Sequence, residues 1–335
     1  MHVLDYERGT VVASSSTREE LDELAVQPGG QSVAMITRSG LLSRMAVTGE
    51  HTAGLRDCWP DDRSFGHEFA WSPDGAELLV TGFARTAWLF ASAGWDAPAS
   101  LTVGDETMVV CGAWSSDGAR FALGGSNGLI QIFDRGLHVL QRLQIPWTAA
   151  DRSAPCYLTA LAFDPSTKRL AAGTSAAQTF LLRLSDGSVE QRLSHADLTI
   201  AGFLEITTID FSPDGTRLVD TGNDWWQVRE WEVATGKELW RFDNGGGNGH
   251  PLQARYSSDG ARVLTNLHGR VFESRSGKPL ARFLDVPTLG TGTLELLPDG
   301  RSGFVPTCAG IEVYDIESRR LLLRLSGGKV EPGAR

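Results

Sequence analysis

Short runs of alternating apolar and polar residues, each ended by turn residues, fill most of this chain. The clearest example is the stretch from Ile209 to Phe242, which reads IDFSPDGTRLVDTGNDWWQVREWEVATGKELWRF. It holds four such runs, IDF, TRLV, QVREWEV and KELWRF, separated by PDG, GND and ATG. Alternation over runs this short is the signature of β-strands, and the separators supply the backbone angles that turns need. The stretch therefore predicts one antiparallel meander of four strands.

Copies of this meander recur along the chain. The strand and turn that open it occur seven times, as LAVQPGG, FAWSPDG, GAWSSDG, LAFDPST, IDFSPDG, ARYSSDG and LELLPDG, beginning at Leu24, Phe69, Gly112, Leu161, Ile209, Ala254 and Leu294. Their turn glycines, mostly about 40–45 residues apart, are expected to be structural: Gly30, Gly75, Gly118, Gly215, Gly260 and Gly300. One meander cannot bury its own faces, so seven copies predict an all-β protein of stacked repeats.

The third strands carry a further signature, in which an aromatic residue precedes an acid. It occurs as Trp231-Glu232, Phe133-Asp134 and Tyr314-Asp315, and its fullest setting is DGTRLVDTG followed by VREWEVATGKEL. From about Leu21 to Leu325 the chain resembles the WD-repeat (Trp-Asp) β-propellers, as a degenerate member of the bacterial type. The resemblance implies a seven-bladed β-propeller of four-stranded antiparallel blades.

The resemblance also implies a buried structural network and a role. Members of the family bury a network of His, Ser or Thr, Asp and Trp, to which Thr221, Asp224 and Trp231 would contribute in the fifth blade. The implied role is a non-catalytic scaffold that binds another protein or a peptide.

The repeats predict one propeller domain over residues 1–326. The first residues, HVLDYE and TVVASS, read as an extra strand pair. We expect residues 1–16 to pack on the last blade or close it, which would protect a sheet edge. An eight-bladed ring is the alternative, although one blade would then be half empty. Residues 327–335, GGKVEPGAR, read as a flexible tail.

Charge and cysteine usage narrow the class of partner. With 31 Lys and Arg against 41 Asp and Glu, the net charge of −10 disfavours nucleic acid and anionic membranes. The four cysteines form no CxxC pair, so we expect no metal site and no cofactor. The N-terminus lacks the pattern of a secretory leader, and no run has the length of a membrane span. The last two features predict a cytoplasmic protein, and we expect it to be monomeric by itself.

The order of the strands predicts which loops meet. In a meander, the turn between the second and third strands and the connector to the next meander leave at the same end, here called the upper rim. We expect the upper rim to bind the partner, through loop tryptophans and histidines: Trp59, Trp147, Trp225, Trp226, His195 and His250. The alternative is that these tryptophans pin their own loops and that the histidines are local hydrogen-bonding groups. By contrast, Trp71, Trp114 and Trp231 lie within strands and are expected in the core.

An enzyme is the alternative function. No nucleophile motif, zinc motif or phosphate-binding loop occurs, so we predict no catalytic residue. A metal-dependent hydrolase or lyase acting on a small molecule would use acids and histidines of the upper rim, such as Asp57, Asp61, Glu68, Asp105, Asp151, His195, Glu205 and His250. An enzyme predicts a closed pocket with converging ionisable groups, whereas a scaffold predicts a broad and partly apolar face.

Overall fold

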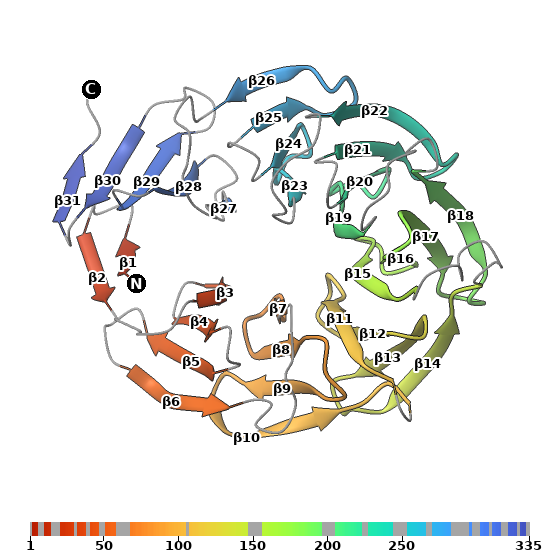
Figure 1. Ribbon diagram of the computed structural model, residues 1–335, viewed down its shortest axis with the longest axis horizontal. Helices are drawn as coiled ribbons and strands as arrows, with labels where there is room; N and C mark the ends of the chain where they lie inside the picture. The colour runs from red at the N-terminus through yellow and green to blue at the C-terminus, as the bar shows by residue number, and fades with distance from the viewer. Residues whose placement is uncertain are drawn as a thin grey trace. The chain divides into compact units, whose positions relative to one another are not determined.

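The computed structural model confirms the all-β prediction, since every regular element in the residues that it describes is a β-strand. The structure describes residues 2–5, 10–14, 21–29, 32–37, 41–46, 51–57, 68–104, 107–146, 156–195, 205–222, 227–243, 253–265, 270–282, 295–296, 302–307, 310–315, 321–326 and 329–332. The strands form repeated antiparallel sheets in which successive strands lie side by side (Figure 1). This repeated unit is the blade of a β-propeller, while the number of blades in a closed ring stays a prediction.

Among the described residues, six sheets have four strands, one has five and one has two. The four-stranded sheets comprise β3 (Leu21–Val26), β4 (Ser32–Thr37), β5 (Leu41–Ala46) and β6 (His51–Asp57); β7 (Glu68–Trp71), β8 (Glu77–Thr81), β9 (Ala87–Ala91) and β10 (Gly94–Leu101); β11 (Val109–Trp114), β12 (Arg120–Gly125), β13 (Leu129–Asp134) and β14 (Val139–Gln144); β15 (Leu158–Phe163), β16 (Arg169–Thr174), β17 (Gln178–Arg183) and β18 (Val189–Ser194); β19 (Ile206–Phe211), β20 (Arg217–Gly222), β21 (Gln227–Glu232) and β22 (Lys237–Asp243); and β23 (Ala254–Tyr256), β24 (Arg262–Thr265), β25 (Arg270–Glu273) and β26 (Pro279–Arg282). The five-stranded sheet comprises β27 (Glu295–Leu296), β28 (Ser302–Thr307), β29 (Gly310–Asp315), β30 (Leu321–Ser326) and β31 (Lys329–Pro332), and β1 (His2–Asp5) pairs with β2 (Thr10–Ser14).

The order of strands in each four-stranded sheet follows the chain, so the first and fourth strands are its edges. The upper end of a sheet is the end at which its second and third strands are joined. The lower end carries the turn between the first and second strands.

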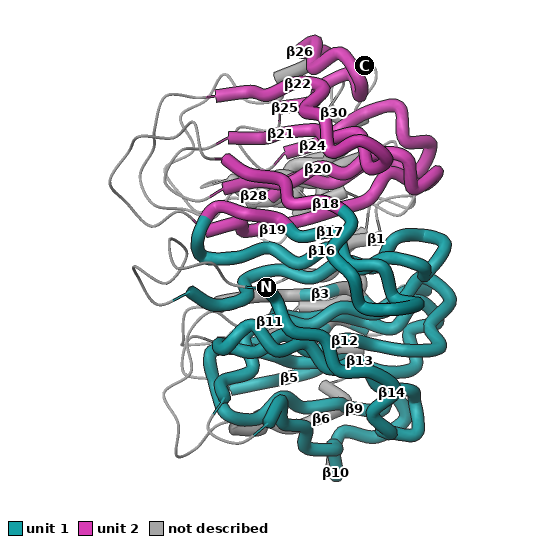
Figure 2. The backbone as a smooth tube through the Cα atoms, turned by 90° about the vertical axis from the view of Figure 1, so that its right-hand side faces the viewer, with its two compact units in different colours: residues 1–3, 12–176, 180–190 teal, residues 4–11, 177–179, 191–335 magenta. Residues whose placement is uncertain are grey.

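The chain divides into two compact units, coloured separately in Figure 2. One unit holds residues 1–3, 12–176 and 180–190, and the other holds residues 4–11, 177–179 and 191–335. Each unit contains several complete sheets with apolar clusters between neighbouring sheets. The prediction of one continuous propeller domain stays a prediction.

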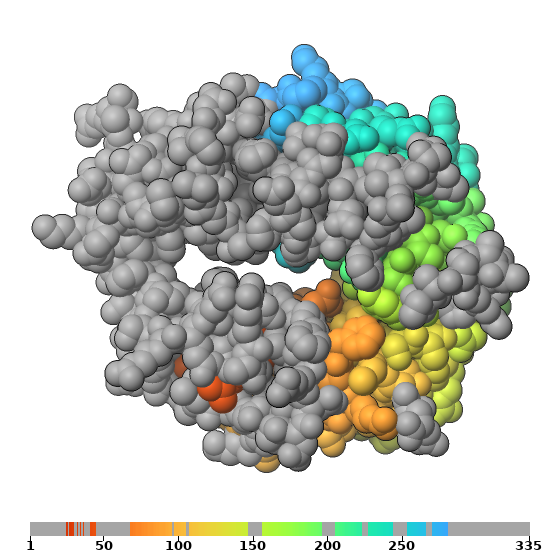
Figure 3. All heavy atoms as spheres, in the orientation of Figure 1, coloured from red at the N-terminus to blue at the C-terminus, as the bar shows by residue number. Residues whose placement is uncertain are grey.

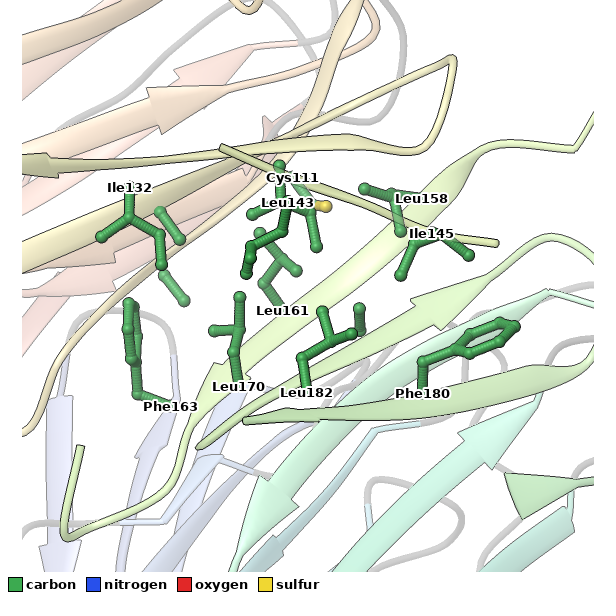
Figure 4. Close-up of a cluster of buried hydrophobic side chains, with 14 of the residues drawn as sticks. Cys111, Ile132, Leu143, Ile145, Leu158, Leu161, Phe163, Leu170, Phe180 and Leu182 are labelled. Atoms are coloured by element: carbon green, nitrogen blue, oxygen red, sulfur yellow. The ribbon is translucent and has the colours of Figure 1, made fainter. Parts of the chain in front are cut away.

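Apolar side chains from neighbouring sheets form the core. In the first unit, Cys111, Ile132 and Leu143 of one sheet face Leu161, Leu182 and their neighbours of the next (Figure 4). The middle strands are covered on both faces, which explains why ALGG in β12 and LVDTG in β20 are buried at every position. Burying one large apolar side chain contributes roughly 1.5–3 kcal/mol, so most of the stability lies between sheets.

Four of the lower turns share one hydrogen-bonded design, with the sequence Ser-x-Asp-Gly. In the turn of Ser72, Asp74 and Gly75, the serine hydroxyl donates to the aspartate at 2.7 Å and the glycine N–H donates to the serine carbonyl at 2.8 Å. The glycine has a φ of +68°, in the left-handed region. The same arrangement recurs at Ser115 to Gly118, Ser212 to Gly215 and Ser257 to Gly260. The predicted glycines therefore close turns, and Gly30 and Gly300 lie outside the described residues.

Indole groups of first strands hydrogen-bond to the sheet before. The Nε1–H of Trp114 donates to the carbonyl of Ala70 at 3.0 Å, and that of Trp71 donates to the carbonyl of Ala25 at 3.3 Å. Both side chains were predicted to lie in the core, yet they are only partly buried and pack against the border of the buried clusters in their unit. Each indole therefore fastens its own sheet to its neighbour through a polar contact and an apolar one.

The two ends of the chain refine the sequence prediction. Strands β1 and β2 do form a hairpin, as a separate two-stranded sheet, while its packing on the last blade stays a prediction. The predicted tail needs correction, because residues 329–332 form β31 and pair antiparallel with β30. Ser326 lies opposite Lys329 in this pairing.

Alanine substitutions at three glycines should separate backbone strain from crowding. Gly94→Ala should change the free energy of unfolding by less than about 0.5 kcal/mol, since φ is not positive there and nothing lies within 4 Å of the added Cβ. Gly29→Ala should cost about 1–2 kcal/mol, because φ is +87° with open space. Gly75→Ala should cost more, because its Cβ would also lie 2.7 Å from the Pro28 carbonyl oxygen. Urea unfolding of the three variants checks this order, and equal losses would contradict it.

The lower turns should make the protein sensitive to acid. Hydrogen bonds from the Ser72 hydroxyl and the Ala76 N–H lower the pKa of Asp74 to about 2, below the value of about 3.9 in unfolded chains. A depressed pKa contributes stability above the unfolded value, and this contribution is lost as the pH falls through the folded value. We expect the urea midpoint of Asp74→Asn to lie below that of the wild type at pH 5 and to approach it near pH 2. A constant difference between the two proteins from pH 5 to pH 2 would refute this assignment.

Candidate functional site

A buried carboxylate organises the upper part of the sheet from β19 to β22. Asp220, in β20, is fully buried and accepts a hydrogen bond from the Trp231 Nε1–H at 2.8 Å on one oxygen. Its other oxygen accepts from the Thr179 hydroxyl at 2.8 Å and lies 3.2 Å from Nε2 of His195. The rings of His195 and Trp231 also contact, with centroids 5.6 Å apart. Three side chains, from two strands and a connector, thus meet on the carboxylate of Asp220.

The contacts of Asp220 explain how a carboxylate is tolerated without solvent. Burial alone would raise the pKa of Asp220, but the charge of His195 and the hydrogen bonds from His195, Trp231 and Thr179 outweigh it, and the pKa is lowered. A buried carboxylate without partners would cost several kcal/mol, so the network is stable only when its members are all present. The network joins β17, β20 and β21 around one buried carboxylate.

This network corrects two assignments made from the sequence, those of Thr221 and His195, and adds a carboxylate that the sequence did not single out. Trp231 lies in the core as predicted, but the carboxylate is Asp220, whereas Asp224 lies outside the described residues. Thr221 is buried in another cluster, where its hydroxyl is 2.8 Å from the hydroxyls of Thr207 and Thr208. His195 was predicted to face a partner, yet its side chain is 1% exposed because it is held against Asp220. His195 therefore belongs to the scaffold.

Buried polar contacts hold the two strands that flank Trp225 and Trp226 in the sequence. Gly222 ends β20 opposite Gln227, the first residue of β21, so four residues join the two positions. The Gln227 amide donates to Asp243 at 2.9 Å, and its oxygen accepts from the buried guanidinium of Arg229 at 2.8 Å. The strands at the base of this loop are therefore fixed by buried polar contacts.

A second buried carboxylate joins this sheet to the next one. Glu230 is fully buried and accepts hydrogen bonds from the Trp240 indole at 2.7 Å, the Tyr256 hydroxyl at 2.8 Å and the Arg275 N–H at 2.6 Å. Burial, followed by the charge of Glu230, raises the pKa of Tyr256. Because Tyr256 belongs to β23 and Arg275 follows β25, Glu230 fixes one sheet against its neighbour.

In the first unit, two aromatic rings meet at the upper end. Phe83 lies between β8 and β9, Tyr157 immediately precedes β15, and their centroids are 5.3 Å apart in an edge-to-face arrangement. Both side chains are partly exposed. The neighbouring Ala84 pairs with Val109 through two backbone hydrogen bonds, which fixes the loop. This pair is not among the residues predicted from the sequence, although Phe83 lies in the turn after β8 and Tyr157 directly precedes β15, both at the sheet end predicted to bind partners.

The other predicted partner-binding residues cannot be located. Trp59, Trp147, Trp225, Trp226 and His250 lie outside the described residues. Of the acids and histidines named for the enzyme alternative, the described residues include Asp57, at the end of β6, and Glu68, His195 and Glu205. In the described part of the chain, no three His, Cys, Asp or Glu side chains are placed to hold a metal ion. A helix long and apolar enough to cross a membrane is likewise absent from the residues that were placed.

Substitution of the buried carboxylate should identify the network. Asp220→Ala removes the acceptor of three buried groups, so we expect a loss of roughly 3–5 kcal/mol in the free energy of unfolding. Asp224→Ala, the variant that the sequence prediction singles out, should lose much less. Thermal and urea unfolding of both variants give the comparison. A larger loss for Asp224→Ala would contradict the network described here.

Comparison with known proteins gives a local similarity. No family model matches the chain. Over 116 residues, 34% of the chain, the sequence is 29% identical to WD repeat-containing protein 1 of Rattus norvegicus. The match covers 19% of that protein, so the chain spans about a fifth of this relative's length. This similarity and the repeated four-stranded antiparallel sheets are together consistent with a β-propeller of the WD-repeat type.

Proposed function

We propose that this protein is a non-catalytic scaffold that binds another protein or a peptide through loops at the upper ends of its sheets. The observation that carries the proposal is the anchoring of the four-residue loop after Gly222. Its two ends are paired in the ladder, and the strands beneath it are fixed by the Asp220 and Gln227 contacts. The sequence of this four-residue loop includes two tryptophans in a row, Trp225 and Trp226.

Physical chemistry favours this loop as a contact site. Tryptophan provides a large contact area at a small cost in side-chain entropy, and such residues dominate binding energy when a rigid scaffold holds them. The Phe83 and Tyr157 pair offers a second, partly exposed aromatic contact at the same kind of sheet end. The similarity to a protein named for its WD repeats supports a protein partner in general.

The test is affinity capture from native lysate with purified wild type and a Trp225→Ala/Trp226→Ala double variant. We expect one or more proteins to be retained by the wild type and lost with the double variant, because two aromatic contacts are removed without disturbing a strand. Quantitative mass spectrometry of the retained proteins gives the comparison. Unfolding curves of both proteins establish that the double variant is folded.

The matched control is Lys168→Ala, which changes an exposed residue in a lower turn. This variant should retain the same proteins as the wild type. Equal loss with both variants, or equal retention with the double variant, would exclude the tryptophan loop as the binding site. A captured protein should then be purified and bound to the wild type directly, and failure of that step would refute the scaffold assignment for it.

A further inference from the structure

The outer edge of β14 exposes two neighbouring aliphatic side chains. Val139 is 38% exposed and Leu140 is 54% exposed, and with Val189 they are the exposed large hydrophobic residues of the part that the structure describes. Strand β14 is the fourth and last of its sheet (Figure 1). In Figure 3, atoms of this part of the chain, in yellow, lie open to the viewer. An exposed and apolar edge strand can pair with another chain.

The other fourth strands show how this edge is normally protected. In each sheet we call the two residues equivalent to Val139 and Leu140 the edge pair. The pairing of the third and fourth strands identifies these residues. For β18 they follow from the match of its sequence VEQRLS to VLQRLQ in β14. The edge pair is His51 and Thr52 in β6, Ala97 and Pro98 in β10, Val189 and Glu190 in β18, Glu238 and Leu239 in β22, Pro279 and Leu280 in β26, and Leu321 and Leu322 in β30.

Polar residues or proline guard most of these pairs. Glu190 pairs with Arg169 at 2.5 Å and with Arg183 at 2.7 Å, while Glu238 pairs with Arg229 at 2.9 Å. Proline, found in β10 and β26, has no N–H to donate and so discourages strand addition. Among the described sheets, only β14 and β30 have two aliphatic residues in the edge pair.

The second of these two edges already carries an additional strand, which pairs with Leu323 to Ser326, directly after the edge pair. Strand β31 pairs antiparallel with β30 and makes its sheet five-stranded. In that pairing Glu331 lies opposite Arg324. Arg324 is itself opposite Glu312 in β29, just as Arg142 is opposite Gln131 in β13. In β30, the arginine equivalent to Arg142 therefore has an acid opposite it. Arg142 itself is exposed in β14.

We propose that the edge of β14 binds a short extended segment of another protein as a fifth, antiparallel strand. The segment carries an acid opposite Arg142 and aliphatic residues opposite Val139 and Leu140. Main-chain hydrogen bonds supply affinity, and the acid and the aliphatic pair supply specificity and register. This edge shares no residue with the tryptophan loop, so the proposal does not depend on the proposed function. A second copy of the chain is a poorer occupant, because its β14 offers a basic Arg142 and no acid.

The probe is a fluorescein-labelled peptide, KVETVV, whose glutamate falls opposite Arg142 and whose two last valines fall opposite the edge pair. We expect saturable binding to the wild type by fluorescence polarisation. Arg142→Glu should weaken binding about tenfold, roughly the effect of one charged contact, and should restore binding of the charge-reversed peptide KVKTVV. Leu140→Glu, which installs the guard found in β18, should abolish binding. Arg192→Glu, at the equivalent exposed position of β18, is the matched control and should leave binding unchanged.

Two further measurements separate strand addition from simple attraction. A peptide that is N-methylated at the alternate residues whose N–H groups face β14 should lose binding. The unmodified peptide should slow amide hydrogen exchange at residues 139–144. The absence of saturable binding, equal loss with Arg192→Glu, or unchanged binding of the methylated peptide would overturn the proposal. Self-association that Leu140→Glu abolishes and the peptide does not compete would assign the edge to a second copy instead. All substituted residues are exposed, and unfolding curves verify that each variant is folded.

Discussion

The structure depends on one constraint, which is that a four-stranded sheet has two apolar faces and can cover neither by itself. The second strands of these sheets are buried at nearly every position, so they need a neighbour on each side. The apolar clusters accordingly lie between sheets, such as the one that joins Cys111 and Ile132 to Phe163 and Phe180. Polar groups are admitted to these interfaces only with partners, as Glu230 and Tyr256 illustrate.

Polar and aromatic positions near the upper ends divide into two kinds. The first kind is buried and holds strands in place, as Asp220 and His195 do with full satisfaction of the carboxylate. The second kind lies near strand ends with its side chain partly exposed, as Phe83 and Tyr157 do. In a sequence, both kinds appear as polar or aromatic residues near a strand end. Only the pairing of the strands shows to which kind a residue belongs.

The features that local sequence encodes were predictable. Alternation located the strands, and Ser-x-Asp-Gly located the lower turns, because the serine, the aspartate and the glycine of one turn bond to one another. The lower turn Asp164 to Thr167, with the sequence DPST, departs from this pattern but uses the same chemistry. Its acid comes first, and Asp164 accepts a hydrogen bond from the Ser166 hydroxyl. Thr167 takes the place of the glycine, with a φ of +54°. Trp231 was likewise predictable as a core residue, since it lies in an alternating strand.

Features that depend on distant residues were not predictable. Nothing in RLVDTG shows that Asp220 is the buried acid, because its partners Thr179 and His195 come from the preceding sheet and its connector. Burial of an acid within a strand is costly enough that a loop acid, Asp224, is the natural choice without those partners. The meeting of Phe83 with Tyr157 escapes a sequence reading for the same reason, since the two rings come from different sheets.

The regular spacing of the bonds between sheets has a consequence for how the chain folds. The hydrogen bonds from Trp114 to Ala70, from Trp71 to Ala25 and from Tyr256 to Asp210 join residues 44, 46 and 46 positions apart. Each such bond spans about one repeat, so loop closure costs a similar and modest entropy at every step. A sheet therefore needs only its predecessor as a template, and order propagates along the chain from neighbour to neighbour. Damage to one sheet is transmitted by the same route, first to the sheets that it covers.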